Sequence, residues 1–414
     1  MEVYNPLSRA IYGTLMLQTK MHEVVIVSAV RTPIGSFQGS LSDFTAPKLG
    51  AIAIKAAVER AGISPDDVDE VIMGCVLTGG MGQAPARQAS IYAGLPDHVP
   101  CLTINKVCGS GMKAVMLAAQ SIMLGDSKIV VAGGMESMTN APYVLDKARA
   151  GYRMGNGTII DSMIHDGLWD PYNNCHMGNC GDSTANELGY SREQLDAFSA
   201  ESFARAKAGQ VDGKFNDEIV PVEIPQRKGD PIQFTTDEQP SRGGDPAKLA
   251  ALRPAFSKEG PTTAGNASSI NDGGAALVLM SSDEAANRGL KPLGRVAAYS
   301  THAQEPTKFT TAPAIAIQKL LDKAGLKAED VDLYEINEAF AVVALGCADK
   351  LGIPHDRLNV NGGAVAIGHP IGMTGARLLM TALYELRRRG KKYAIATPCI
   401  GGGEATAVLI EAIF

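Results

Sequence analysis

Two stretches of this chain repeat each other, and this duplication limits the folds that the sequence can adopt. Residues 51–69 read AIAIKAAVERAGISPDDVD and residues 314–332 read AIAIQKLLDKAGLKAEDVD, with nine identical positions at a constant offset of 263. Apolar stretches ending at Gly74 and at Asn337 follow at the same offset. Because each half alternates strand patterns with amphipathic helices, the sequence predicts two similar α/β units packed about a pseudo-twofold axis.

Cys108 lies where a strand pattern turns into a helical one. The segment NKVCGSGMKA covers residues 105–114, and apolar residues then recur at helical spacing until Gly125. A cysteine at a helix N-terminus meets unpaired backbone N–H groups and the positive end of the helix dipole, which favour the thiolate. The neighbouring glycines let a substrate carbonyl approach the backbone. We therefore interpret Cys108 as a reactive nucleophile rather than a buried structural cysteine.

The duplication places His369 opposite Cys108, because the pair Gly-Met that follows each residue matches at an offset of 261. His369 also opens a predicted helix, and its imidazole could take the proton of a thiol or donate to an oxyanion. The far end of that helix carries three arginines, 387–389, followed by Gly390. We interpret them as helix-terminal cations before a glycine cap rather than as a phosphate site.

A third element is the glycine-rich turn TPCIGGG at residues 397–403, between two strand patterns. In a dry pocket Cys399 could act as an acid or base, and Gly401 could supply a backbone N–H. From this motif alone, a small apolar turn residue is an equally good interpretation of Cys399.

Composition excludes several classes of protein. The net charge of −6 over 414 residues argues against nucleic acid as a partner. We expect no membrane-spanning segment, because no run of about 18 apolar residues occurs. Seven cysteines without a secretory leader favour a reducing, cytoplasmic location, with the mitochondrion as the alternative. Residues 1–20 are interpreted as an N-terminal extension. Cys175 and Cys180 flank His176 but lack a second ligand pair, so no metal site is predicted.

Together, four motifs resemble the active-site set of the thiolase family: NKVCGSGMKA at 105–114, NEAFA at 337–341, GHPIGMTGAR at 368–377 and CIGGG at 399–403. This resemblance implies an α/β fold with two duplicated halves in a five-layered α/β/α/β/α arrangement. Residues 21–140 and 261–290 would form the N-terminal half and 291–414 the C-terminal half. Residues 141–260 would form an inserted loop domain that binds CoA.

The resemblance also implies roles for individual residues. Cys108 would become acylated, His369 would activate it, and Cys399 would move the α-proton of the acetyl group. Asn337 would fix a water that forms one oxyanion hole with His369, and the backbone N–H groups of Cys108 and Gly401 would form the other. The implied activity is that of an acetyl-CoA C-acetyltransferase, which condenses two acetyl-CoA reversibly to acetoacetyl-CoA and CoA without a metal or redox cofactor.

Substrate-binding residues follow from the resemblance alone. Ser268 matches the family serine that contacts the pantetheine arm, and Arg242 is a weaker match to a nucleotide-contacting arginine. His176 and Met177 lie in a His-Met-Gly stretch typical of the short-chain, biosynthetic type. Phe203 stands where related mitochondrial enzymes have a tyrosine that helps bind potassium, which puts potassium activation in doubt. The family implies a homo-oligomer, and we expect a tetramer built as a dimer of dimers.

Three alternatives remain at this point. A degradative 3-ketoacyl-CoA thiolase of broad chain length is disfavoured, but not excluded, by the stretch at residues 176–178. The 3-oxoacyl synthases share the duplicated fold but lack a counterpart of Cys399. A non-enzymatic acyl-CoA carrier would have kept the fold and lost the chemistry, and the intact catalytic positions argue against this reading.

Overall fold

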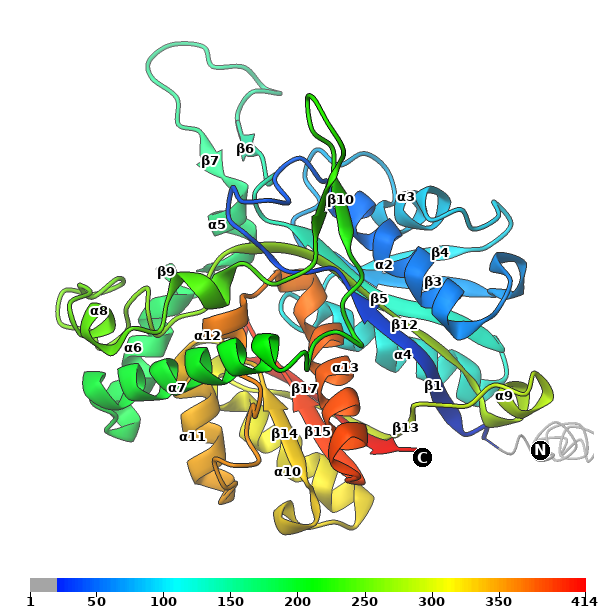
Figure 1. Cartoon of the computed structure of the whole chain (residues 1–414). Coiled ribbons are helices and arrows are strands. Elements are labelled where there is room, and N and C mark those ends of the chain that lie inside the picture. Colours follow the sequence, from blue (N-terminus) through cyan, green and yellow to red (C-terminus); the bar gives the residue numbers. More distant parts are fainter. Residues whose placement is uncertain (1–20) are drawn as a thin grey trace, which may run out of the picture.

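The computed structural model of the protein describes residues 21–414 (Figure 1), so the predicted extension at residues 1–20 lies outside the described residues. The N-terminal half supplies six strands of the central sheet system. They are β1 (Val24–Arg31), β2 (Gly35–Ser36), β3 (Glu70–Gly74), β4 (Cys101–Ile104), β5 (Ile129–Ser137) and β12 (Asn271–Ser281). Their order is β4-β3-β5-β12-β1, and the short β2 pairs with β12.

The C-terminal half repeats this order. Its strands are β13 (Gly294–Ala303), β14 (Leu333–Ile336), β15 (Tyr393–Thr397), β16 (Cys399–Ile400) and β17 (Glu404–Ala412). The order β14-β15-β17-β13 matches β3-β5-β12-β1, and in both halves the first pair is parallel and the next two are antiparallel. β1 and β13 join the halves through two residue pairs, Val25 with Arg295 and Ile26 with Gly294. The predicted duplication of the α/β unit is confirmed.

The repeat extends to the helices beside the strands. Helix α2 (Ala46–Ala61) corresponds to α10 (Ala312–Ala324), and the turn η1 (Pro65–Asp67) corresponds to η4 (Ala328–Asp330). Both helices stop at a glycine in the left-handed region, Gly62 with φ 70° and Gly325 with φ 67°. A residue without Cβ adopts this conformation without strain, so the repeated glycine ends both helices.

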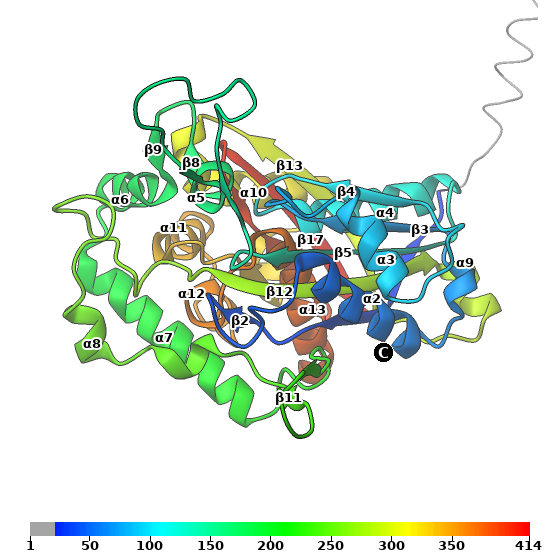
Figure 2. The same ribbon diagram turned by 90° about the horizontal axis from the view of Figure 1, so that it is seen from above.

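Helices and sheets form the five predicted layers (Figures 1 and 2). The helices outside the inserted segment, besides α2 and α10, are α3 (Pro85–Tyr92), α4 (Ser110–Leu124), α9 (Ser282–Asn287), α11 (Ala341–Leu351), α12 (Ala364–Ile367) and α13 (Ile371–Arg389). α2 and α3 cover the outer face of the N-terminal strands, and α10 and α11 cover that of the C-terminal strands. α4 and α13 pack against each other between the two halves.

The apolar core follows this layering. Successive residues of β12 point to opposite sides, as expected for a strand buried on both faces. One set, Ala275, Leu277 and Leu279, packs with α4 and α13, and the other, Ala276, Val278 and Met280, packs with α2. The stretch Val107–Leu124 is long and apolar enough to cross a membrane, but more than half of it is buried, as expected of a helix in the central layer.

The two central helices approach closely because glycines stand at their contact. A Cβ on Gly111 would lie 2.9 Å from the carbonyl oxygen of Gly372, and a Cβ on Gly375 would lie 2.5 Å from the backbone nitrogen of Met112. Larger residues would push the helices apart. The N-terminal ends of α4 and α13 therefore meet at the middle of the molecule, which brings the residues before them together.

The segment between β5 and β12 includes the predicted inserted domain, residues 141–260. It contains β6 (Tyr143–Val144), β7 (Ile160–Asp161), α5 (Ser162–Gly167), β8 (Trp169–Asp170), β9 (Cys175–His176), α6 (Met177–Leu188), α7 (Arg192–Val211), β10 (Val222–Ile224), β11 (Ile232–Phe234), η2 (Gln239–Arg242) and α8 (Pro246–Ala250). α6 and α7 pack on α11, and α7 also packs on α12. Its helices α6 and α7 therefore pack on the second half (Figure 1), whereas β10 packs on Leu41 and Leu49 of the first half, in which the segment is inserted.

Candidate active site

A cavity of about 530 Å³ lies where the two halves and the inserted segment meet. Seven of the nine predicted site residues line it: Cys108, His176, Met177, Arg242, Ser268, His369 and Gly401. The other two, Asn337 and Cys399, are fully buried at 0% exposure. Asn337 contacts His369, and Cys399 lies close enough to Cys108 for a thiolate there to raise its pKa. Residues that are far apart in the chain are therefore brought together as predicted.

Cys108 stands on a tight turn between β4 and α4. The preceding residue, Val107, has φ 46°, a left-handed conformation that is strained for a β-branched side chain. The hydroxyl of Ser110 holds this turn, since it accepts from the backbone N–H of Lys106 at 2.8 Å and donates to the carbonyl of Val107 at 2.7 Å. The turn presents the half-buried Cys108 to the cavity.

Burial opposes the helix N-terminal field that the sequence predicts to favour a Cys108 thiolate. Burial raises the pKa of Cys108 to about 11, and the charge of Glu136 raises it further. The backbone N–H groups of Gly401 and of Cys108 itself act in the opposite direction. At neutral pH Cys108 is therefore a thiol that needs a base. The same two N–H groups are the predicted oxyanion donors, and both reach the Cys108 sulfur.

His369 is held from several sides between α12 and α13. Its backbone N–H donates to Asn271 Oδ1 at 2.9 Å, and its Nδ1 lies 2.7 Å from Thr374 Oγ1. The hydroxyl proton of Thr374 is directed at the carbonyl of Pro370, 2.9 Å away. Thr374 must then accept from Nδ1, so Nδ1 carries the imidazole proton and Nε2 is the free base. Burial lowers the pKa of His369 to about 3, with the nearby Arg377 as a second cause, which keeps the ring neutral.

Asn337 follows β14 directly and reaches the basic nitrogen of His369. Its Nδ2 lies 3.4 Å from His369 Nε2, and its backbone N–H donates to the carbonyl of Thr397 at 2.9 Å. The amide oxygen, Oδ1, is buried and has no hydrogen-bond partner among residues 21–414. Buried amide oxygens rarely stay unpaired, so this atom is suited to hold a water or a substrate group.

Cys399 lies in β16, on the hairpin that pairs with β17. Burial raises the pKa of its thiol, and the neighbouring Cys108 and Cys347 raise it further. Cys399 is therefore protonated at rest and can act first as an acid. Burial alone is compatible with both interpretations of the motif, but the closeness of Cys399 to Cys108 favours the role of acid or base.

The substrate-binding candidates Ser268 and Arg242 also line the cavity. Ser268 is fixed by a backbone hydrogen bond from its N–H to the carbonyl of Ala339 at 2.9 Å. Arg242 ends η2 and keeps about half of its side chain exposed, with Glu238 3.6 Å away. A guanidinium at a cavity rim that is only loosely paired can still contact an anionic ligand.

Aromatic side chains form another part of the cavity wall. His176 caps α6 and stacks on Phe256, with ring centroids 4.8 Å apart. Phe256 meets Phe340 edge to face at 5.9 Å, and Met177 is buried beside them at 8% exposure. Burial lowers the pKa of His176 as well. The wall is therefore apolar and neutral, as an acyl group requires.

Three residues that hold the catalytic groups in place were not predicted from the sequence. Thr374 and Asn271 hold His369, and the buried Glu136 accepts backbone N–H groups of Val76, Leu77 and Gly372 at 2.9–3.1 Å. Glu136 thereby ties the end of β3 to the start of α13, and burial raises its pKa to about 7. Thr374 belongs to the motif at 368–377, but the contact that gives it a role appears only in three dimensions.

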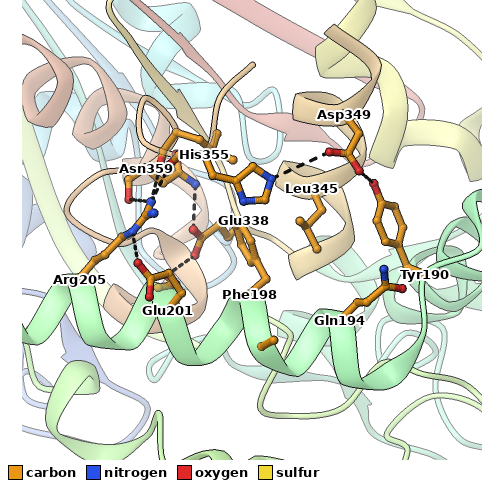
Figure 3. Close-up of a pocket in the computed structure, with 13 residues that line it drawn as sticks. Tyr190, Gln194, Phe198, Glu201, Arg205, Glu338, Leu345, Asp349, His355 and Asn359 are labelled. Atoms are coloured by element: carbon orange, nitrogen blue, oxygen red, sulfur yellow. Dashed lines mark hydrogen bonds and ion pairs between the residues drawn. The ribbon is translucent and has the colours of Figure 1, made fainter. Parts of the chain in front are cut away.

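A second cavity of about 420 Å³ lies apart from these residues, between α7, α11 and the loop at 355–359 (Figure 3). Its polar groups already have partners. Arg205 pairs with Glu201 at 2.8 Å, and Asp349 accepts from the hydroxyl of Tyr190. None of the predicted site residues lines it. It has no part in the arrangement around Cys108.

Comparison with known proteins agrees with this geometry. The family model "Thiolase, N-terminal domain" matches residues 24–283 and "Thiolase, C-terminal domain" matches residues 290–412. The chain is 54% identical to an acetyl-CoA acetyltransferase of Chromobacterium violaceum and 53% identical to one of Cupriavidus necator, in each case over 94% of this chain and at least 99% of the relative. The crystal structure of the Bacillus anthracis acetyl-CoA acetyltransferase superposes with a TM-score of 0.93 at 43% identity, covering 96% of this chain and all of that one. The chain therefore belongs to the thiolase family.

Proposed function

We propose that the protein is an acetyl-CoA C-acetyltransferase, which interconverts two acetyl-CoA with acetoacetyl-CoA and CoA. The observation that carries the proposal is that Cys108 and His369, at two equivalent helix starts, line one cavity, while the buried Cys399 of the hairpin lies close enough to Cys108 for a thiolate there to raise its pKa. The names of relatives more than 50% identical over nearly the whole chain support it.

In the thiolysis direction, Nε2 of neutral His369 takes the proton of Cys108 as the sulfur attacks the 3-carbonyl of acetoacetyl-CoA. The oxyanion that forms accepts hydrogen bonds from backbone N–H groups of Cys108 and Gly401. The C2–C3 bond then breaks, which leaves an acetyl group on Cys108 and the enolate of acetyl-CoA. Cys399 gives its proton to the enolate carbon and becomes a thiolate.

The second half-reaction restores every group. The Cys399 thiolate takes the proton of incoming CoA, whose sulfur attacks acetyl-Cys108 and releases acetyl-CoA. Protonated His369 then returns its proton to the Cys108 thiolate. A water held by the free amide oxygen of Asn337, together with His369, would stabilise the enolate oxygen. Condensation follows the same steps in reverse.

A chain-length series tests the proposal. Thiolysis of acetoacetyl-CoA would be followed by loss of the magnesium-enolate absorbance, with 3-oxohexanoyl-CoA and 3-oxodecanoyl-CoA as competing substrates. We expect turnover of the shortest substrate alone, because the bulky side chains of Met177, Phe256 and Phe340 line the cavity and would limit the room for a longer acyl chain. Equal turnover of the longer substrates would instead identify a degradative thiolase. No turnover of any substrate would favour a non-enzymatic acyl-CoA carrier.

We further propose that the reaction requires neither a metal, a redox cofactor nor potassium. Phe203 is buried at 4% exposure, and a Cβ on Gly243 or Gly244 would lie 2.3–2.4 Å from its side chain. The position therefore offers neither a hydroxyl nor room for an ion. We expect the same rate in potassium and in sodium buffers, and stimulation by potassium alone would contradict this.

We also propose that the protein is a homotetramer. The hairpin that carries β6 and β7 projects from the body (Figure 1) and exposes apolar side chains, with Met154 98%, Ile159 64% and Tyr143 63% exposed. Contiguous exposed apolar groups mark interaction surfaces. Light scattering should give four chains, and replacing Met154 and Ile159 by serine should lower the mass. A monomer would contradict the proposal.

A further inference from the structure

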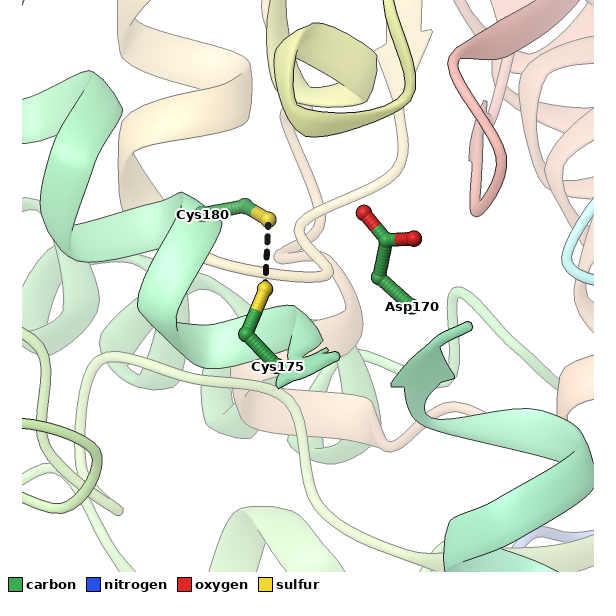
Figure 4. A group of neighbouring side chains, drawn as sticks. All are labelled: Asp170, Cys175 and Cys180. Atoms are coloured by element: carbon green, nitrogen blue, oxygen red, sulfur yellow. Dashed lines mark hydrogen bonds between the residues drawn. The ribbon is translucent and has the colours of Figure 1, made fainter. Parts of the chain in front are cut away.

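Two cysteines outside the catalytic set lie close together at the start of α6. The sulfur atoms of Cys175 and Cys180 are 4.0 Å apart, and both thiols are free (Figure 4). Cys175 is half-buried and Cys180 is buried. Neither lines the catalytic cavity, but His176 and Met177, which follow Cys175 directly, do.

The local helix geometry explains why the two sulfurs meet. His176 is the N-cap of α6: its Nδ1 accepts from the backbone N–H of Gly178 at 3.0 Å, and its own N–H donates to Asn179 Oδ1 at 3.1 Å. Cys175 is therefore the residue before the N-cap and Cys180 is the fourth helical residue. Side chains at these two positions pack on each other across a helix start. Here both members of the pair are thiols.

The cluster offers two free donor atoms rather than a complete metal site. Asp170 lies beside the thiols, with the three ligand atoms within 4.8 Å of one another. Its oxygens are occupied, however, because they accept from the backbone N–H groups of Tyr172 and Asn173 at 2.8 and 3.2 Å and from Asn173 Nδ2 at 2.8 Å. Structural zinc sites need about four protein ligands and catalytic ones about three. The chemistry left to the cluster is that of a dithiol.

The dithiol is connected to the cavity wall. His176, between the two cysteines, stacks on Phe256, and Asn179 Nδ2 donates to the carbonyl of Phe256 at 3.0 Å. A disulfide has an S–S distance of about 2.05 Å, so closure would draw the sulfurs together by roughly 2 Å. This movement would act on the residues that hold the aromatic wall.

We propose that Cys175 and Cys180 form a modification site that takes low-molecular-mass disulfides and closes to a reversible intramolecular disulfide. The thiolate of the more accessible Cys175 attacks the disulfide RSSR, which forms a mixed disulfide and releases one thiolate. Cys180 then loses its proton and attacks the Cys175 sulfur, releasing the second. Two protein thiols are oxidised, RSSR is reduced to two RSH, and the two protons pass to the released thiolates.

Peptide mapping tests the site independently of any activity. The full-length Cys108→Ala variant removes Cys108 as a possible disulfide partner. It would be treated with oxidised glutathione, alkylated with a first label that marks free thiols, reduced, and alkylated with a second label that marks thiols released from disulfides. We expect Cys175 and Cys180 both to carry the second label, while Cys101, also half-buried, carries the first. First label on both cysteines, or a link from either one to a different cysteine, would overturn the proposal.

The effect on catalysis rests on the proposed function and is measured separately. Oxidised wild-type enzyme should lose about five- to 100-fold in kcat/KM for acetoacetyl-CoA, because displacements near 1 Å in a site can cost about 100-fold. Dithiothreitol should restore it. Before oxidation, Cys180→Ser and Cys175→Ser should have the same kcat/KM as the reduced wild-type enzyme, and oxidation should not lower it. The matched control Cys101→Ser should lose activity on oxidation as the wild type does. If oxidation lowered kcat/KM equally in the wild type and in Cys180→Ser, the proposed effect of the disulfide on the cavity would be overturned. If the reduced wild-type enzyme were inactive, only the proposed function would be refuted.

Discussion

The two turns that carry Cys108 and His369 occupy equivalent places in the two halves, yet they hold their residues differently. The first turn is strained at Val107, with φ 46°, and presents a half-buried thiol to the cavity. The second buries its imidazole at 5% exposure between Asn271 and Thr374. One copy of the duplicated turn displays a nucleophile, and the other fixes the orientation of a base.

Burial has one common result in both turns, although it shifts the two pKa values in opposite directions. It raises the pKa of Cys108 to about 11 and lowers that of His369 to about 3. Both groups are therefore neutral at pH 7. The thiolate and imidazolium form together only when the proton moves between them during the reaction.

The largest expected effect is that of removing the displayed nucleophile. Cys108→Ala should lower thiolysis by about 10⁴-fold or more, because no acyl-enzyme can form. Acetylation of the protein by acetyl-CoA, measured by intact mass, should disappear as well. The matched variant Cys101→Ser should keep both. Acetylated protein in Cys108→Ala would show that another residue is the nucleophile.

Removing the base should cost about 10²- to 10⁴-fold at neutral pH in His369→Ala. Since the pKa of Cys108 is raised to about 11, the variant should regain activity as pH increases toward 10, where more thiolate forms unaided. The wild-type enzyme should show no such rise. A flat pH–rate profile in the variant would contradict the role of His369 as the base for Cys108.

Thr374→Val tests whether the orientation of His369 matters. The change keeps the shape but removes the acceptor of the Nδ1 proton, and an unpaired buried donor costs about 1–3 kcal/mol. We expect kcat to fall roughly five- to 150-fold with little change in KM. Thr374→Ser should retain most of the activity. If the valine variant raised KM with kcat unchanged, Thr374 would act in binding rather than in positioning the ring.

The smallest expected effect is on stability in acid. The folded-state pKa of His369 is lowered to about 3, below the value of about 6.5 in the unfolded chain. As pH falls, the imidazole of the unfolded chain therefore binds a proton before that of the folded protein. The contribution of the neutral His369 to the free energy of unfolding is complete above pH 6.5 and is lost as pH falls below it. The loss should approach about 1.4 kcal/mol per pH unit below 6.5. The free energy of unfolding, measured with urea at pH 7.5 and 5.5, should change less with pH in His369→Gln than in the wild type. The same change in both proteins would contradict a neutral, buried ring at His369.

The sequence could predict the fold to an unusual depth because of its internal repeat. The offset of 263 that aligns residues 51–69 with 314–332 also relates the ends of α2 and α10 and the turns η1 and η4. Order and direction of the strands follow the same repeat. The family resemblance likewise led to seven residues that line one cavity and to two, Asn337 and Cys399, that are fully buried.

What the sequence could not predict depends on contacts between distant segments. The helix N-terminus that favours a Cys108 thiolate is visible locally in the sequence, whereas the burial that raises the pKa of this thiol is a property of the whole fold. Thr374 lies five residues after His369, but its hydrogen bond depends on how α13 begins. The spacing of Cys175 and Cys180 in the sequence suggests only a metal site without a second ligand pair. Their packing as a pair across a helix start required the cap at His176 to be seen.

The protonated state of Cys108 has a further consequence for the lifetime of the enzyme. Peroxides and other electrophiles react with thiolates, and the thiolate fraction of a group with a pKa of about 11 is very small at pH 7. We therefore expect the idle enzyme to be oxidised to sulfenic or sulfinic acid only slowly. Chemical durability between turnovers thus follows from the same burial that makes the nucleophile dependent on a base.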